Sequence, residues 1–170
     1  RARLSLRRTL RNEHLLLAVM ALVVGVAAAY GALVFRLAID LMQELAFGFP
    51  LDEMMPSTEA LAWWHIMLVP AVGGLLIGVF LHFANGGNRP HAIGHVIEAS
   101  ALRGGKMSLR DGLVSAVGNA ASLGAGASTG REGPLVHLGA TLAAWMSDRL
   151  NLDRSQSRTL LGCGVAAAIG

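Results

Sequence analysis

The chain has 170 residues, of which 54% are hydrophobic and only 15% are charged, and its mean hydropathy is +0.53. Soluble domains carry about 25% charged residues, so this composition favours a protein embedded in a membrane. The net charge of +3 does not indicate a nucleic-acid partner, because the positive-inside rule accounts for the basic cluster before the first hydrophobic segment: Arg1, Arg3, Arg7, Arg8 and Arg11.

Glycine and cysteine usage agrees with a membrane protein. The 21 glycines suit closely packed transmembrane helices, because small residues let helix backbones approach one another. The single cysteine, Cys163, allows no disulfide within the chain and no multi-cysteine metal site, and we interpret it as a small apolar helix residue. The chain starts at an arginine, shows no secretory signal and ends inside an apolar run, so we expect it to be part of a longer protein.

The first hydrophobic segment, residues 15–35, carries no charge and spans about 30 Å as a helix, enough to cross the hydrocarbon core of a bilayer. Arg36 and Asp40 follow with the i, i+4 spacing of a helical ion pair, so we expect the helix to continue, long and tilted. Residues 1–14 then form a basic N-terminus on the cytoplasmic side. Residues 15–170 belong to one membrane domain.

The next segments alternate between polar and hydrophobic. Residues 51–59 are acidic and contain Pro56, which predicts an external loop. Residues 61–84 form a second span with aromatic residues at its start, as at a membrane interface, and with Pro70 inside it. A short helix is expected over residues 91–102, and a basic turn then follows on the cytoplasmic side.

Two short hydrophobic segments, residues 113–129 and 134–146, meet at Gly130–Pro134. Both are short for a membrane crossing, so we interpret them as discontinuous helices whose ends converge inside the membrane. Transporters build ion sites in this way, because irregular backbone is tolerated at that depth only where it lines a cavity. Residues 147–158 are interpreted as polar and exposed, and a last apolar segment begins near Thr159.

The polar centre of this region is Arg131–Glu132, followed by Gly133 and Pro134. Proline is favoured in the first helical turn, where its missing N–H costs nothing, so Pro134 predicts a helix start. Free N–H groups and the positive end of the helix dipole make such a start a site for an anion. Because Glu132 lies just before it, the carboxylate of Glu132 could occupy the place of the anion. The alternative is a solvated pair of charges in a surface loop.

Enzyme-type motifs do not fit the glycine-rich run. A Walker loop needs GxxxxGK[ST], and Gly124 to Arg131 offers neither that spacing nor the lysine. The dinucleotide fingerprint GxGxxG also fails, because the glycines here give GxGxxxG after an apolar helix. Ser128 and Thr129 lie near Glu132, but no nucleophile–base pair or metal set accompanies them. We therefore expect no enzyme.

The sequence GREGP at residues 130–134, followed by an apolar helix, resembles the signature of the CLC family of chloride channels and chloride–proton exchangers. The likeness includes the lead-in LGAGAST, the earlier HVIEA and the later LLGCGVAAAIG; it covers residues 90–170, whereas residues 1–85 match only in hydropathy. It implies an all-α integral membrane protein, a bundle of tilted, discontinuous helices whose ends converge on an anion pathway. It also implies a homodimer surrounded by lipid in a bacterial inner membrane, with the N-terminus in the cytoplasm.

By this resemblance the protein is a voltage- or pH-gated chloride channel or a chloride–proton antiporter, and Glu132 is its gating glutamate. The carboxylate would compete with anions for the pathway and move away when protonated or displaced. The resemblance assigns the anion mostly to backbone amides at Gly130, Arg131, Gly133 and the turn after Pro134, with the arginine adding positive potential. Chloride is the transported ion, and no cofactor is implied.

The chain departs from the family at a second motif, GSGIP, whose serine helps to coordinate the central anion. Counting back without gaps from the gating position places residues 90–94 on this motif, where Ile93 is kept and His91 replaces the serine. An imidazole N–H or the helix-start backbone could still donate to an anion, so His91, Ala92 and Ile93 join the candidate anion-binding residues. In a rival alignment Gly87 takes the place of the serine, and His91 is an ordinary interfacial residue.

A second hypothesis is a divalent metal-cation transporter. His91 and His95 are spaced i, i+4, and Glu98 follows on much the same helical face, a pattern that can bind a metal. The lack of carboxylates in the apolar segments and the positive charge of Arg131 argue against it. His137, in the helix after Pro134, is interpreted as a packed polar residue.

Overall fold

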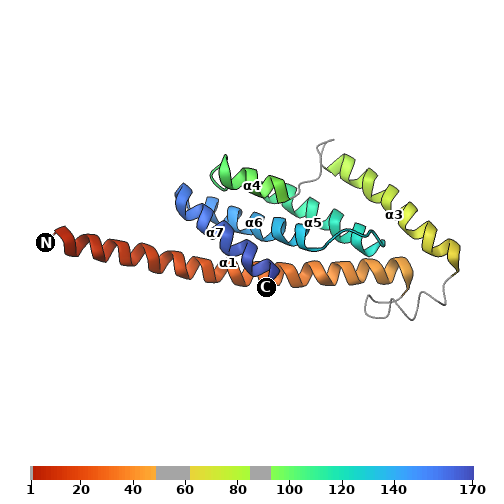
Figure 1. The fold of residues 1–170 in the computed structure, drawn as a ribbon, viewed down its shortest axis with the longest axis horizontal. Helices are drawn as coiled ribbons and strands as arrows, with labels where there is room; N and C mark the ends of the chain where they lie inside the picture. The colour runs from red at the N-terminus through yellow and green to blue at the C-terminus, as the bar shows by residue number, and fades with distance from the viewer. Residues whose placement is uncertain (1, 49–61, 85–92) are drawn as a thin grey trace.

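The computed structural model describes residues 2–48, 62–84 and 93–170, and every regular element in these ranges is an α-helix. The helices are α1 (Ala2–Phe47), α3 (Trp63–Ala84), α4 (Ile93–Ala101), α5 (Leu109–Gly124), α6 (Glu132–Arg149) and α7 (Arg154–Ile169). Figure 1 shows the longest helix as a rod on which α5, α6 and α7 pack, while α4 packs on α6 and α3 on α5. The prediction of an all-α membrane protein is confirmed for this part of the chain.

The helix α1 is continuous over 46 residues, which at 1.5 Å per residue makes it about 70 Å long. This length exceeds the roughly 30 Å of a hydrocarbon core, as predicted for a long and tilted helix. Residues 2–14, expected as a basic N-terminus, form its first turns. Arg36 and Asp40 lie on the helix as predicted, but no ion pair joins them in the described part of the chain.

Two helical segments among the described residues are long and apolar enough to cross a membrane, Leu15–Phe47 within α1 and the whole of α3. The helix α3 is continuous through Pro70, and none of its side chains is buried. Leucine, valine, phenylalanine and tryptophan side chains of α3 are exposed. Soluble monomers rarely expose so large an apolar surface, so this helix suits a lipid environment.

The packed region is built around α6, which contacts α1, α4, α5 and α7. Ala140, Ala143 and Ala144 of this helix are buried. Gly139 faces Gly164 of α7 so closely that a Cβ atom on either residue would overlap the carbonyl oxygen of the other. Small residues therefore bring the two helix backbones into contact, which confirms the role expected for glycine.

The helix boundaries near the glycine-rich run differ from the predicted segments. The helix α5 ends at Gly124 rather than Thr129, and Gly126 turns the chain at a φ of 92°, a conformation that glycine adopts without strain. The helix α6 begins at Glu132, so Pro134 lies within its first turn instead of opening it. A proline is tolerated at that place because first-turn N–H groups have no intrahelical acceptor.

The prediction that residues 147–158 are polar and exposed holds for most of the segment but not for Ser147 and Ser157. The helix α7 begins within this segment at Arg154, where Asp153 caps it. Ser147 and Ser157 are buried, and their hydroxyl groups are hydrogen-bonded to each other across the junction of α6 and α7. Mutual pairing removes the cost of burying both hydroxyls, and sequence polarity does not reveal such a pairing.

The turns at residues 102–108 and 150–153 lie together at one end of the bundle, where the Arg158 guanidinium donates to the carbonyl oxygen of Ala101 at 2.9 Å. The N-terminus of α1 points to the same end (Figure 1). The helices α4 and α6 both run toward this end, so their N-termini point away from it (Figure 1). The described candidate anion-binding residues, which lie at or next to these N-termini, are therefore away from the two turns.

Candidate functional site

The N-terminus of α6 has no described side chain as a cap. Arg131 occupies the N-cap position in a helical conformation and makes no capping hydrogen bond. By contrast, Ser108 caps α5 and Asp153 caps α7 through side-chain oxygens. The first turn of a helix leaves backbone N–H groups without intrahelical acceptors, so the start of α6 offers hydrogen-bond donors to a ligand.

The N-terminus of α4 lies directly beside that of α6. A Cβ atom placed on Gly133 would be 3.7 Å from the Cδ1 atom of Ile93, which is an ordinary van der Waals contact. Further along, the ring centroids of His95 and His137 are 6.1 Å apart, so the packing of the two helices continues past their first turns. His137 is buried, as predicted. Two positive helix-dipole ends therefore converge at one place.

This convergence differs from the one that the hydrophobic pattern predicted. Residues 113–129 and 134–146 were expected to meet end to end, but α5 stops at Gly124 and residues 125–131 separate it from α6. Ile93 and Gly133 are brought together as candidate anion-binding residues, with Gly130 in the adjoining turn. Counting back along the sequence from Glu132 to the second family motif had identified Ile93 as a candidate, and GREGP had identified Gly133.

Two further candidate residues, His91 and Ala92, lie outside the described residues. Of the proposed metal ligands, Glu98 forms an ion pair with Arg103 at 2.8 Å, and His95 packs against His137. Among the residues with described positions, no three histidine, cysteine, aspartate or glutamate side chains lie close enough together to hold a metal ion.

Glu132 is the first residue of α6, and its side chain is exposed in this part of the protein. A carboxylate in the first helical turn is attracted by the helix dipole and by the free N–H groups. The position therefore combines a negative side chain with backbone donors that suit a negative ligand. Pro134, two residues later, contributes no N–H, so the backbone donors come from the residues around it.

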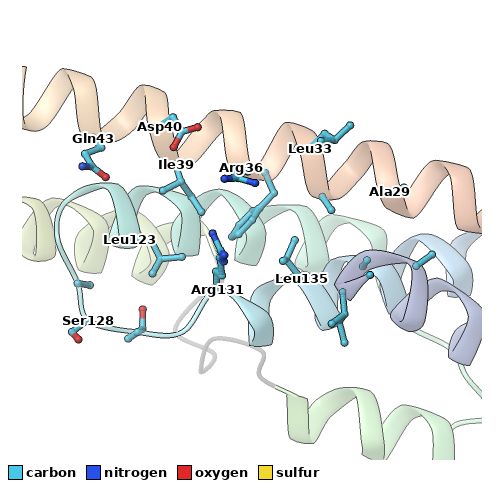
Figure 2. A pocket seen from close by; sticks show the side chains of 18 of the residues that line it. Ala29, Leu33, Arg36, Ile39, Asp40, Gln43, Leu123, Ser128, Arg131 and Leu135 are labelled. Atoms are coloured by element: carbon cyan, nitrogen blue, oxygen red, sulfur yellow. The ribbon is translucent and has the colours of Figure 1, made fainter. Parts of the chain in front are cut away.

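Arg131 faces a different space from Glu132. A cavity of about 710 Å³ lies between α1, the turn after α5 and the C-terminal end of α7, and Arg131 lines it while Glu132 does not. Figure 2 shows the Arg131 side chain reaching from the turn toward α1, which carries Arg36, Asp40 and Gln43.

This cavity was not predicted from the sequence, although the spacing of the polar residues in α1 indicates a polar surface there. Arg36, Asp40 and Gln43 recur at i, i+4 and i+7, which places three polar side chains on one face of an otherwise apolar helix. That stripe indicates a polar neighbour in the fold. Which segment supplies the neighbour cannot be read from α1 itself.

Comparison with known proteins gives a consistent set of relatives. The family described as voltage gated chloride channel matches residues 73–170. A ClcB-like chloride channel protein of Ralstonia nicotianae is 32% identical over 150 residues, which cover 86% of this chain and 35% of that protein. The voltage-gated ClC-type chloride channel ClcB of Escherichia coli K12 is 30% identical over 154 residues, 88% of this chain and 36% of that protein.

The voltage-gated ClC-type chloride channel ClcB of Shigella boydii is 29% identical over 154 residues, which cover 88% of this chain and 36% of that protein. The chain thus spans about a third of the length of the curated relatives that it matches. No solved structure matches it at a comparable level of significance.

Proposed function

Because this chain belongs to the voltage-gated chloride channel family, we propose that it forms the N-terminal part of a membrane domain that moves chloride or a related small anion. The proposal rests chiefly on one observation, the meeting of the α4 and α6 N-termini at Ile93 and Gly133. A small anion loses most of its hydration inside a membrane, and backbone N–H donors and helix dipoles can replace that hydration.

Glu132 is the gating residue in this proposal. Its carboxylate carries the same charge as the transported anion and lies at the N-terminus of α6, so the two compete for the same donors. Protonation removes the negative charge, weakens the hold of the N–H groups on the side chain and leaves them to the anion. A rise in anion concentration acts in the same direction by displacement. The anion flux would therefore depend on the pH and on the anion concentration of the solution.

The proposal extends to a homodimer in a bacterial inner membrane, with the N-terminus of α1 in the cytoplasm. Gating by voltage or by pH, and operation as a channel or as a chloride–proton antiporter, are alternatives within it. They differ in whether a proton crosses the membrane with each anion transported. Simultaneous recording of chloride and proton movement separates the two modes.

The test is Glu132→Gln in the full-length protein, reconstituted in liposomes. Glutamine resembles the protonated glutamate and cannot titrate, so anion flux should persist, while its increase on acidification and any coupled proton movement should be lost. Glu44→Gln is the matched control, because Glu44 is an exposed carboxylate on α1. It should keep the wild-type pH response.

Two results would contradict the proposal. Flux through the Glu132→Gln protein that still rises on acidification as in wild type would remove Glu132 from the gate. Liposomes that take up divalent cations but neither chloride, nitrate nor fluoride would replace anion transport with the metal-transport hypothesis.

A further inference from the structure

A polar crevice of about 430 Å³ lies between the two turns at the end of the bundle toward which α4 and α6 run (Figure 1). One wall is the turn after α4, and the other comprises the end of α6, the turn after it and the start of α7. Its charged side chains are Arg103, Lys106, Arg154, Asp148 and Asp153. The crevice therefore shares no residue with the candidate anion site at the α6 N-terminus.

Specific contacts hold the two walls of the crevice together. The Arg158 guanidinium donates to the carbonyl oxygen of Ala101 at 2.9 Å. Gly104 and Gly105 have φ angles of 64° and 85°, which glycine adopts without strain. The Arg154 side chain lies across this turn, since a Cβ atom on Gly104 would be 3.2 Å from its Cγ atom. The positions of the lining side chains are thus set by the packing of one turn on the other.

The charges in the crevice balance. The Arg103 guanidinium is already paired with Glu98, at 2.8 Å between Nη2 and Oε1. No ion pair among the described residues joins any of the other charged side chains of the crevice, which are Lys106, Arg154, Asp148 and Asp153. Two positive and two negative groups therefore face the same space without neutralising one another at contact distance. Such a crevice matches a zwitterion better than a simple anion or cation.

Exposed apolar side chains place the crevice at the level of lipid headgroups. Trp145, one turn before the end of α6, is 39% exposed, and the guanidinium carbon of Arg149 lies 5.5 Å from the centre of its ring. Tryptophan and arginine are typical of the membrane–water interface, where the ring meets lipid and the charge reaches water. Leu102 and Leu150, one in each turn, are also exposed. Leucine side chains beside a charged crevice suit a ligand with both a polar and an apolar part.

We propose that this crevice binds the headgroup of a phospholipid that carries a primary ammonium group, as phosphatidylethanolamine does. Lys106 and Arg154 hold the phosphate, as cationic pockets at the ends of membrane helices do. Asp148 accepts hydrogen bonds from the ammonium group, because Asp153 already accepts from the backbone N–H of Gln156 at 2.7 Å as the cap of α7. The acyl chains lie against the exposed leucines.

The size of the crevice agrees with this ligand. A volume of about 430 Å³ has room for roughly fourteen water molecules at about 30 Å³ each, so a phosphoethanolamine group fits with several waters. A lipid held there joins the turn after α4 to the start of α7 and stabilises this end of the bundle. The inference requires a chain embedded in a membrane, but it does not depend on anion transport.

The first experiment is native mass spectrometry of the full-length protein in detergent, titrated with one phospholipid at a time. Phosphatidylethanolamine should bind more tightly than phosphatidylcholine, which has the same charges but no N–H donor, and than phosphatidylglycerol, which has no amine. Lys106→Gln should raise its dissociation constant about three- to tenfold, the loss expected for one hydrogen bond. Arg110→Gln is the matched control, because Arg110 is exposed near the same turn but does not line the crevice.

The second variant tests the carboxylate. Asp148→Asn should reduce the preference for phosphatidylethanolamine over phosphatidylcholine and leave the affinity for phosphatidylcholine unchanged. Glu44→Gln, an exposed carboxylate on α1, should keep the preference. Lys106 and Asp148 are both exposed, so neither substitution should change the melting temperature of the lipid-free protein.

Soluble phosphoethanolamine and inorganic phosphate separate a lipid site from a site for a free phosphate compound. Both should displace the lipid only at much higher concentration, because they lack the acyl chains. Displacement at the concentration of the lipid itself would overturn the assignment to a lipid. Equal affinities of the wild-type protein for the three phospholipids, or an affinity that Lys106→Gln leaves unchanged, would overturn the site. None of these results bears on the gating test at Glu132.

Discussion

At the scale of single residues, Arg131 and Glu132 are neighbours in the chain, but their side chains lie in different places. The arginine lines the cavity beside α1, whereas the glutamate opens α6 and is exposed. Consecutive residues at a helix start are turned by about 100° about the helix axis, which is sufficient to separate the two groups.

The candidate site could be found from sequence in part. GREGP located Glu132 and Gly133, and counting back to the second motif located Ile93, which the structure places against Gly133. The cavity with Arg36 could not be found in this way, because its two walls are far apart in the chain. Local spacing carries no information on which distant helix supplies the second wall.

His91 gives a prediction at the same scale, because it precedes the α4 residue that contacts Gly133. His91→Ser in the full-length protein should change the ratio of nitrate to chloride flux by up to about tenfold, since a hydroxyl and an imidazole N–H hold different anions with different hydrogen-bond strength. Liposome flux with chloride, nitrate and fluoride measures the ratio. His82→Ser, an exposed histidine near the end of α3, is the control, and identical ratios for His91→Ser and wild type would make His91 an ordinary interfacial residue.

At the scale of elements, the contact of α6 with α7 holds the helix that carries the site. Gly139 and Gly164 meet backbone to backbone, while Leu160 and Leu161 of α7 are buried beside Ala143 of α6 and Val24 of α1. This packing fixes the axis of α6 and therefore the direction of its N-terminal N–H groups. A shift of the axis would turn those groups away from the start of α4.

The glycine contact can be tested with one substitution at two positions of the same helix. A Cβ on Gly164 would lie 2.6 Å from the Gly139 carbonyl oxygen, whereas a Cβ on Gly162 would meet nothing within 4 Å. Gly164→Ala should destabilise the protein by about 1–3 kcal/mol through overpacking, and Gly162→Ala should be neutral or stabilising by up to about 1 kcal/mol. Thermal denaturation of the full-length protein in detergent compares them; equal stabilities would exclude a tight α6–α7 contact.

At the scale of the whole molecule, basic residues gather at one end of the bundle. The turn between α4 and α5 is basic, and the turn between α6 and α7, which itself carries only Asp153, is flanked by Arg149 and Arg154. Both turns share an end with the N-terminus of α1 (Figure 1). Away from these turns, the carboxylates Asp40 and Glu44 of α1 and Glu132 of α6 are accompanied by Arg36 and Arg131. Because basic ends face the cytoplasm, this distribution supports the orientation in our proposal, with the α4 and α6 N-termini toward the outside. The basic residues of the two turns and the helix ends that flank them are Arg103, Lys106, Arg110, Arg149, Arg154 and Arg158.

The orientation leads to a labelling prediction. In a full-length background with Cys163→Ser and any other cysteines removed, a membrane-impermeant thiol reagent applied outside intact cells should label Thr129→Cys. It should label Lys106→Cys only after the membrane is opened. Both positions are exposed, so access to the reagent depends on the side of the membrane. The reverse pattern would invert the proposed topology.

The amino-acid sequence by itself determined the membrane class, the helical content and a helix start near Pro134, two residues from the observed start at Glu132. These properties follow from composition, from the length of hydrophobic runs and from the local chemistry of glycine and proline, all of which act between near neighbours in the chain. Tertiary structure alone decided which helix ends meet, that Ser147 and Ser157 are paired and buried, and that Arg36 shares a cavity with Arg131. Those outcomes depend on how closely whole helices pack, which is set by many distant contacts at once.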